Sequence, residues 1–251
     1  FTALSVADGE LKLTRAGFAD KSAIHLDATD ASTITSFIGP DGATNITNWV
    51  DVRRNGASAS TGGNATIYST NTLLRTVETR NGEMRPVVDF RNFRNRDGAN
   101  LNRDAAAMLF DGSHRLTNVA EAHEIFSDAH GYANAITFGS HVTHEFERGI
   151  SGTWFRDWED MSHVTHGYLA IDGRKATYSS VISDGFHLLS MAPTSAVSLT
   201  ALAFRKEKAK IGGCYVGEIL IYTTPLTAAL VELKLEEHDL LYNTQIFTKK
   251  I

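Results

Sequence analysis

The stretch that most constrains the fold lies near the end of the chain, at residues 216–222. Its sequence, Val-Gly-Glu-Ile-Leu-Ile-Tyr, is apolar on both faces apart from Glu218, as expected for a buried strand. The next segment has a different character. Thr227 is a suitable helix N-cap, and the fifteen residues after it contain neither Gly nor Pro. The sequence therefore predicts a last core strand followed by one short helix within residues 225–243.

Dipeptides and glycines typical of turns recur along the rest of the chain. Asp-Gly stands at positions 8–9 and 172–173, and in each case it follows a run with strand character, 4–7 and 168–171. Such dipeptides are typical of the tight turns that join antiparallel strands. The 20 glycines and the many spaced turns predict an all-β protein.

The length and net charge of the chain limit its domain organisation and the classes of partner that it can bind. The chain has 251 residues, which suits one large β-sandwich, and we expect residues 1–22 to form an N-terminal β-hairpin or leader strand before a domain at 23–251. A net charge of -5 provides no basic field for nucleic acid. No apolar run approaches the roughly 20 residues that span a bilayer, so we expect no membrane insertion.

Several phrases of the sequence resemble one family. They are the segments at 24–33, 46–56, 107–113, 168–174 and 211–222. Together they resemble the laminin-G-like, concanavalin A-like domains of bacterial surface proteins, in the lectin-glucanase superfamily. The resemblance implies a jelly-roll β-sandwich of two antiparallel sheets with a short C-terminal α-helix. It also places Phe110 in a central core strand, while Trp49 is a large core anchor in its own right.

The resemblance also raises calcium as a cofactor, because calcium is common in that superfamily. Carboxylate and backbone oxygens are its ligands, and the loops at 27–30 and 89–97 are the candidates. Asp27 and Asp30 have an alternative role, because Asp side chains often cap the turn that follows them. No single residue is assigned as a metal ligand.

Catalytic and zinc signals are weak. Ser-His-Val-Thr-His occurs at 140–144 and at 162–166, but histidines three positions apart on a strand point to opposite faces. Glu145 and Glu147 share one face of a strand, yet they flank Phe146, which resembles a core position. We therefore assign no catalytic residue and keep these two glutamates as the first to test if the protein cleaves glycans.

The richest candidate binding cluster is the segment 153–160, which holds two of the three tryptophans. Sugar rings stack on exposed aromatic rings, and planar Arg and Asp side chains bond their hydroxyl groups. The alternative is that one tryptophan packs in the core and the charges line a loop. The predicted ligand-binding residues are Trp154, Arg156, Asp157, Trp158 and Asp160.

These observations lead to one leading function and two alternatives. We expect a non-catalytic carbohydrate-binding or adhesion module, extracellular or on the cell surface, that is part of a larger multidomain chain and binds a glycan or surface polysaccharide. A polysaccharide-active enzyme with a divergent site would instead show converging carboxylates, or a His, Tyr and Arg group, in a groove. A structural spacer or assembly domain would show no groove and an exposed apolar patch.

Overall fold

The structure is a computed structural model of the whole chain, and it is all-β wherever it describes the residues. The described residues are 4–7, 10–13, 22–52, 58–60, 72–79, 82–90, 108–110, 116–127, 136–139, 146–147, 168–177, 180, 185–194, 197–199, 201–202 and 214–225. Within them the only helical element is a single 3-10 turn, η1 (Ala31–Thr33). No helix in this part of the chain is long and apolar enough to cross a bilayer.

The strands of the first half follow one another at short intervals. They are β1 (Leu4–Ala7), β2 (Glu10–Leu13), β3 (Ile24–Asp27), β4 (Ile34–Ile38), β5 (Thr44–Val50), β6 (Ser58–Ser60), β7 (Thr72–Glu78), β8 (Met84–Phe90) and β9 (Met108–Phe110).

The strands of the second half include the longest one. They are β10 (Leu116–Val119), β11 (Glu121–Ser127), β12 (Ile136–Gly139), β13 (Phe146–Glu147), β14 (Tyr168–Ile171), β15 (Arg174–Lys175), β16 (Phe186–Ala192), β17 (Val197–Leu199), β18 (Ala201–Leu202) and β19 (Cys214–Tyr222).

One large antiparallel sheet connects fifteen of these strands. Its main path runs β13-β12-β18-β9-β6-β5-β7-β8-β19-β11-β16-β14-β15, with β3 attached to β19 and β4 to β5. The strand predicted at 216–222 is part of β19, which has a central position in the sheet because it pairs with β3, β8 and β11. The predicted hairpin of β1 and β2 forms a separate two-stranded sheet, and β10 with β17 forms another.

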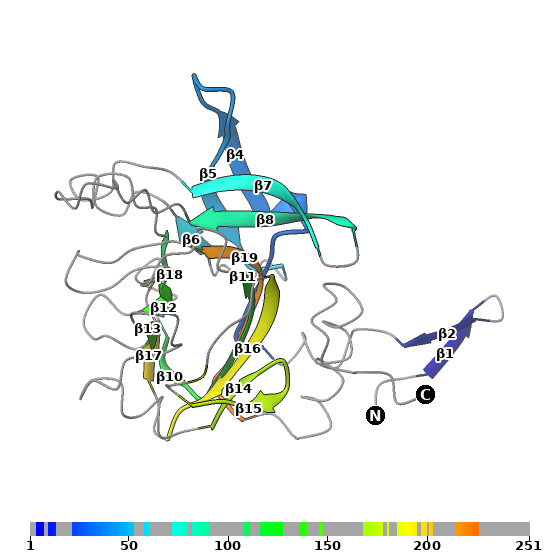
Figure 1. Ribbon diagram of the computed structural model, residues 1–251, viewed down its shortest axis with the longest axis vertical. Helices are drawn as coiled ribbons and strands as arrows, with labels where there is room; N and C mark the ends of the chain where they lie inside the picture. The colour runs from blue at the N-terminus through cyan, green and yellow to red at the C-terminus, as the bar shows by residue number, and fades with distance from the viewer. Residues whose placement is uncertain are drawn as a thin grey trace.

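The sheet encloses its main core. Figure 1 shows β11, β16 and β14 on one side, β12, β13 and β17 on the other, and β4, β5, β7 and β8 at one end. The largest hydrophobic cluster includes Leu189 of β16, Val119 of β10 and Trp49 of β5, which are at most 1% exposed. Trp49 is thus confirmed as a core anchor. Removing this apolar surface from water is the main favourable contribution to folding.

A β-bulge at Gly217 gives β19 its two faces. Phe126 of β11 lies opposite Val216, and the next pair is Ile125 opposite Glu218, so Gly217 is an extra residue in β19. Without it, Val216 and Glu218 would point to the same side. With it, Val216 joins the main core, while Glu218 points away from that core.

Several local predictions are confirmed. The N–H of Thr29 donates to Oδ1 of Asp27, and the N–H of Ser32 donates to Oδ1 of Asp30, so both aspartates cap the turn after β3. Asp172 and Gly173 take φ values of 51° and 72° in the tight turn between β14 and β15. Residues 226–243 of the range predicted to hold the helix, 225–243, lie outside the described part, as does the side chain of Phe110.

Candidate functional site

The layer formed by β3, β19, β11, β16 and β14 has two buried faces. One face belongs to the main core. The other, which we call the polar face, carries seven polar side chains that are at most 9% exposed. Register and strand alternation place these on the same side: His25, Asp27, Glu121, His123, Ser127, Ser190 and Glu218.

A pocket opens at one end of the polar face. Cross-strand pairing places Asp89 of β8, Tyr215 of β19, Ser127 of β11 and Phe186 of β16 in one row across four strands. The end of β7 lies beside this row. The hollow has a volume of about 340 Å³, and its lining residues are Val77, Glu78, Thr79, Ser127, Gly185, Phe186 and Tyr215.

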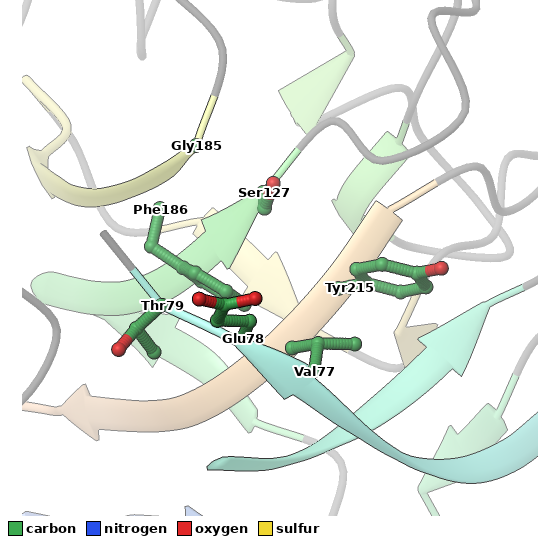
Figure 2. Close-up of a pocket in the computed structure, with 7 residues that line it drawn as sticks. All are labelled: Val77, Glu78, Thr79, Ser127, Gly185, Phe186 and Tyr215. Carbon is green, nitrogen blue, oxygen red and sulfur yellow. The ribbon is translucent and has the colours of Figure 1, made fainter. Parts of the chain in front are cut away.

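The pocket has an aromatic wall and a polar rim. Figure 2 shows the Tyr215 ring at one end of the hollow and Phe186, Glu78 and Thr79 toward the other. Phe186 belongs to a small hydrophobic cluster with Val87, Ile125 and Leu188, against which Tyr215 also packs. Phe186 and Tyr215 thus connect the lining of the hollow to this cluster, while the exposed Glu78 provides a carboxylate.

Tyr215 is held as a neutral hydroxyl donor. Burial raises the pKa of Tyr215, the Asp89 carboxylate raises it further, and Arg75 opposes them. Asp89 has a fully buried side chain, and Nε of Arg75 donates to its Oδ2. The hydroxyl of Tyr215 therefore stays protonated across the physiological pH range, where it can donate a hydrogen bond.

A hydrogen-bonded chain of three side chains crosses the polar face. Ser190 Oγ lies 2.9 Å from Nδ1 of His123, and Oε1 of Glu121 lies 2.8 Å from its Nε2. The residue types match a nucleophile, a base and an orienting acid. However, Ser190 and His123 are each only 1% exposed, so a substrate has no access to the hydroxyl. This chain satisfies buried polar groups and fixes the register of β11 on β16.

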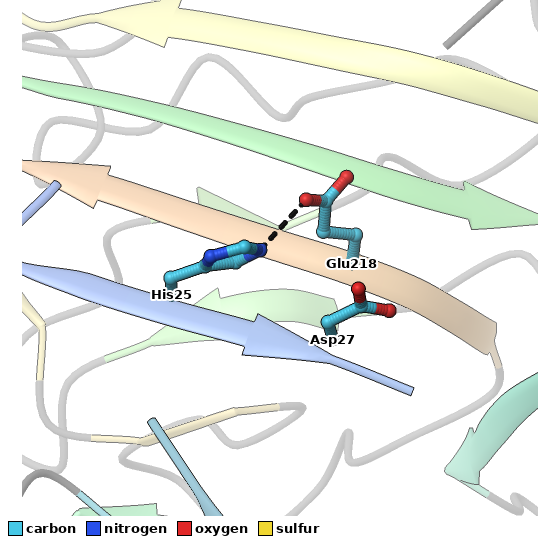
Figure 3. A group of neighbouring side chains, drawn as sticks. All are labelled: His25, Asp27 and Glu218. Carbon is cyan, nitrogen blue, oxygen red and sulfur yellow. Dashed lines mark hydrogen bonds and ion pairs between the residues drawn. The ribbon is translucent and has the colours of Figure 1, made fainter. Parts of the chain in front are cut away.

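A second polar cluster lies where β3 pairs with β19. The cluster consists of His25, Asp27 and Glu218, each at most 9% exposed, and Figure 3 shows the three side chains directed toward one another. Nε2 of His25 lies 2.8 Å from Oε1 of Glu218. One nitrogen or oxygen atom from each of the three residues lies within 4.8 Å of the others. These are the residues that could hold a metal ion.

The sequence-predicted binding cluster falls outside the described residues. This applies to Trp154, Arg156, Asp157, Trp158 and Asp160, to both Ser-His-Val-Thr-His segments, and to the side chains of Glu145 and Glu147. The proposed calcium loop at 89–97 is described only at its start, where Asp89 is a buried strand residue paired with Arg75. In the loop at 27–30, Oδ1 of each aspartate accepts the N–H of a residue in the turn, so both side chains act as caps through that oxygen.

Sequence reasoning did not find the pocket or the polar clusters as sites. Tyr215 and Ser127 lie far apart in the sequence, and only the strand register makes them neighbours. One signal was available. Glu218 is the single charged residue in an otherwise apolar strand, and a buried carboxylate needs a partner.

Comparison with known proteins adds no assignment. No protein-family model matches the chain, and no curated protein matches it significantly.

Proposed function

We propose that this chain is a non-catalytic carbohydrate-binding or adhesion module, and that the pocket beside Tyr215 takes a sugar residue of a glycan. The observation that carries the proposal is the combination of two aromatic residues, Phe186 and Tyr215, with hydroxyl groups and a carboxylate around the same hollow. Carbohydrates present apolar C–H faces between hydroxyl groups. A ring flanked by polar groups at its edge complements both features.

The polar groups support a neutral sugar as the ligand. Glu78 accepts hydrogen bonds, the hydroxyl of Tyr215 donates one, Ser127 does either, and Thr79 accepts because its O–H is already used. Thr79 is oriented by a hydrogen bond from its Oγ1 to the carbonyl of Glu83, 3.1 Å away. A carboxylate at the rim disfavours anionic ligands, because like charges repel at short range.

The lining of the pocket favours binding over cleavage. Glycoside hydrolysis uses a pair of carboxylates on either side of the bond that breaks. Among the described lining residues, Glu78 is the one carboxylate. The presence of a hollow with a polar rim also supports a binding module over a structural spacer.

The finer fold and location belong to the same proposal. A large antiparallel sheet around one core agrees with the jelly roll that the resemblance implies. A module of that kind is extracellular or attached to a cell surface, within a larger multidomain protein. One small pocket contributes limited affinity, so strong attachment would come from repeated copies.

A glycan array followed by calorimetric titration tests the proposal. We expect the full chain to bind a neutral oligosaccharide weakly and saturably, and Tyr215→Ala to lose this binding. Glu78→Gln should reduce the affinity about tenfold or more, because it removes about one hydrogen bond to a charged group. Tyr215→Phe is the matched control, since it keeps the ring and removes only the hydroxyl.

Trp158→Ala separates the two candidate surfaces. If sugar binds at the pocket, this variant binds as the wild type does. If Trp158→Ala abolishes binding while Tyr215→Ala does not, the ligand contacts residues 153–160 and the pocket assignment is wrong. Release of reducing sugar from any oligosaccharide would contradict the non-catalytic assignment.

A further inference from the structure

We propose that His25, Asp27 and Glu218 form a binding site for a divalent transition metal ion of the zinc class. The ion would join β3 to β19 and have a structural role. The inference is independent of the sugar pocket, because the two sites share no residue.

Backbone geometry brings the three side chains to one place. His25 and Asp27 are two positions apart on β3, so they share a face. In the antiparallel ladder, Asp27 pairs directly with Glu218 of β19, and His25 pairs with Leu220. The bulge at Gly217 turns Glu218 to this face. The pairing of β3 with β19 and the bulge therefore place one imidazole and two carboxylates close together.

The charges at this point favour a dication. Asp27 and Glu218 are 9% and 7% exposed, and like charges directly opposite each other on a sheet are destabilising. A protonated His25 would contribute one positive charge to the two carboxylates. A divalent ion bound to all three ligands contributes two positive charges and leaves the imidazole neutral, which is its metal-binding form.

The ligand types select the ion. An imidazole nitrogen with carboxylate oxygens suits zinc, whereas calcium takes oxygen ligands almost without exception. A tetrahedral ion with bonds of about 2.0–2.1 Å separates its ligand atoms by about 3.3 Å. The distances in the cluster lie on both sides of this value. Nε2 of His25 is 2.8 Å from Oε1 of Glu218, and the three ligand atoms all lie within 4.8 Å of one another.

Neighbouring groups hold the side chain of one ligand and the backbone of another. The N–H and Oγ1 of Thr29 donate to Oδ1 of Asp27 at 2.8 and 2.7 Å. These two bonds restrict the orientation of the Asp27 carboxylate and leave Oδ2 as its metal-binding atom. The backbone N–H of His25 donates to Oδ2 of the buried Asp51 at 2.6 Å, which fixes the backbone of β3 at this position.

Zinc titration of the chelator-treated full chain tests the inference. We expect one Zn²⁺ per chain by calorimetry, a higher Tm in its presence, and no comparable effect of Ca²⁺. Glu218→Gln and Asp27→Asn should each weaken zinc binding by more than the 10- to 100-fold that loss of a supporting hydrogen bond costs. Asp172→Asn is the matched control, because Asp172 also pairs with a histidine, His187, at 2.6 Å but lies outside the cluster. This variant should bind zinc as the wild type does.

A measurement on the wild type keeps the test independent of variant folding. In a nitrogen-15 spectrum of the histidine rings, Zn²⁺ should shift Nε2 of His25 and leave His123 and His187 unchanged. Zinc binding without a change at His25, or retained in Glu218→Gln, would overturn the inference. So would the absence of zinc binding to the wild type. A site at His25 with no sugar binding would leave this inference standing and reject only the proposed function.

Discussion

The two faces of the β3-β19-β11-β16 layer are both largely buried, but they are held together by different interactions. On the core face, Ile219, Ile221 and Leu189 pack into one large cluster at no more than 1% exposure. On the polar face, His123 and Ser190 are just as buried, and they are held by directed hydrogen bonds. Glu124 is an exception, because it is completely buried on the core side of β11.

The difference shows that burial has two physical consequences. An apolar face gains free energy roughly in proportion to the area removed from water and tolerates changes that preserve volume. Each hydrogen bond on a polar face adds only a small net free energy of folding, but removing one partner costs much more because a buried polar group is left unpaired. We therefore expect the core face to contribute most of the stability and the hydrogen bonds of the polar face to favour this strand register.

The largest expected effect is on the core face. Phe126→Ala should lower the free energy of unfolding by about 3–5 kcal/mol, because it deletes a buried ring and leaves a cavity. Urea unfolding followed by circular dichroism measures the change. A loss below about 1 kcal/mol would mean that this face is not the main source of stability.

An intermediate and non-additive effect is expected on the polar face. Ser190→Ala leaves Nδ1 of His123 without this partner and should cost about 1–3 kcal/mol. His123→Leu alone should also destabilise the protein. The double variant should cost less than the sum by about 0.5–3 kcal/mol, because both ends of the hydrogen bond are then replaced. Additivity within experimental error in the double-mutant cycle would contradict the proposed coupling.

The smallest effect concerns alkaline pH. Burial and then Glu121 raise the pKa of Tyr168, and burial and then Asp89 raise that of Tyr215. The folded state therefore keeps these protons where the unfolded chain loses them, above a pH of about 10. Stability should be unaffected by these groups below that pH and should fall as the pH rises through the folded-state pKa values.

The variants Tyr168→Phe and Tyr215→Phe isolate this contribution. The Tm of each variant should fall less than that of the wild type between pH 9 and pH 11. If the curves of both variants ran parallel to that of the wild type, neither tyrosine would be perturbed by folding.

The elements could be predicted from the sequence because their signals are local. A continuous apolar run predicted the buried strand β19, Asp-Gly predicted the β14–β15 turn, and Asp27 and Asp30 predicted a capped turn after β3. Each of these depends on neighbours within a few positions. Trp49 is a partial exception, because its size alone predicts burial.

The sites could not be predicted because they depend on register. His25 and Glu218 are separated by 193 positions, and they meet only because β3 pairs with β19 beyond the bulge at Gly217. The pocket likewise depends on four strands ending side by side. A shift of one residue in any of these pairs would turn every side chain to the other face. No local pattern carries that information.

The central position of β19 has a consequence for the order of folding. Residues 214–222 bridge β3, β8 and β11, all of which a ribosome would produce much earlier. During synthesis, β3 and β11 must remain without their shared neighbour until this late segment emerges. Pairings so distant in sequence are slow to form, and exposed strand edges attract other chains in the meantime. We therefore expect nascent chains stopped before residue 214 to bind chaperones, and release to coincide with the arrival of β19.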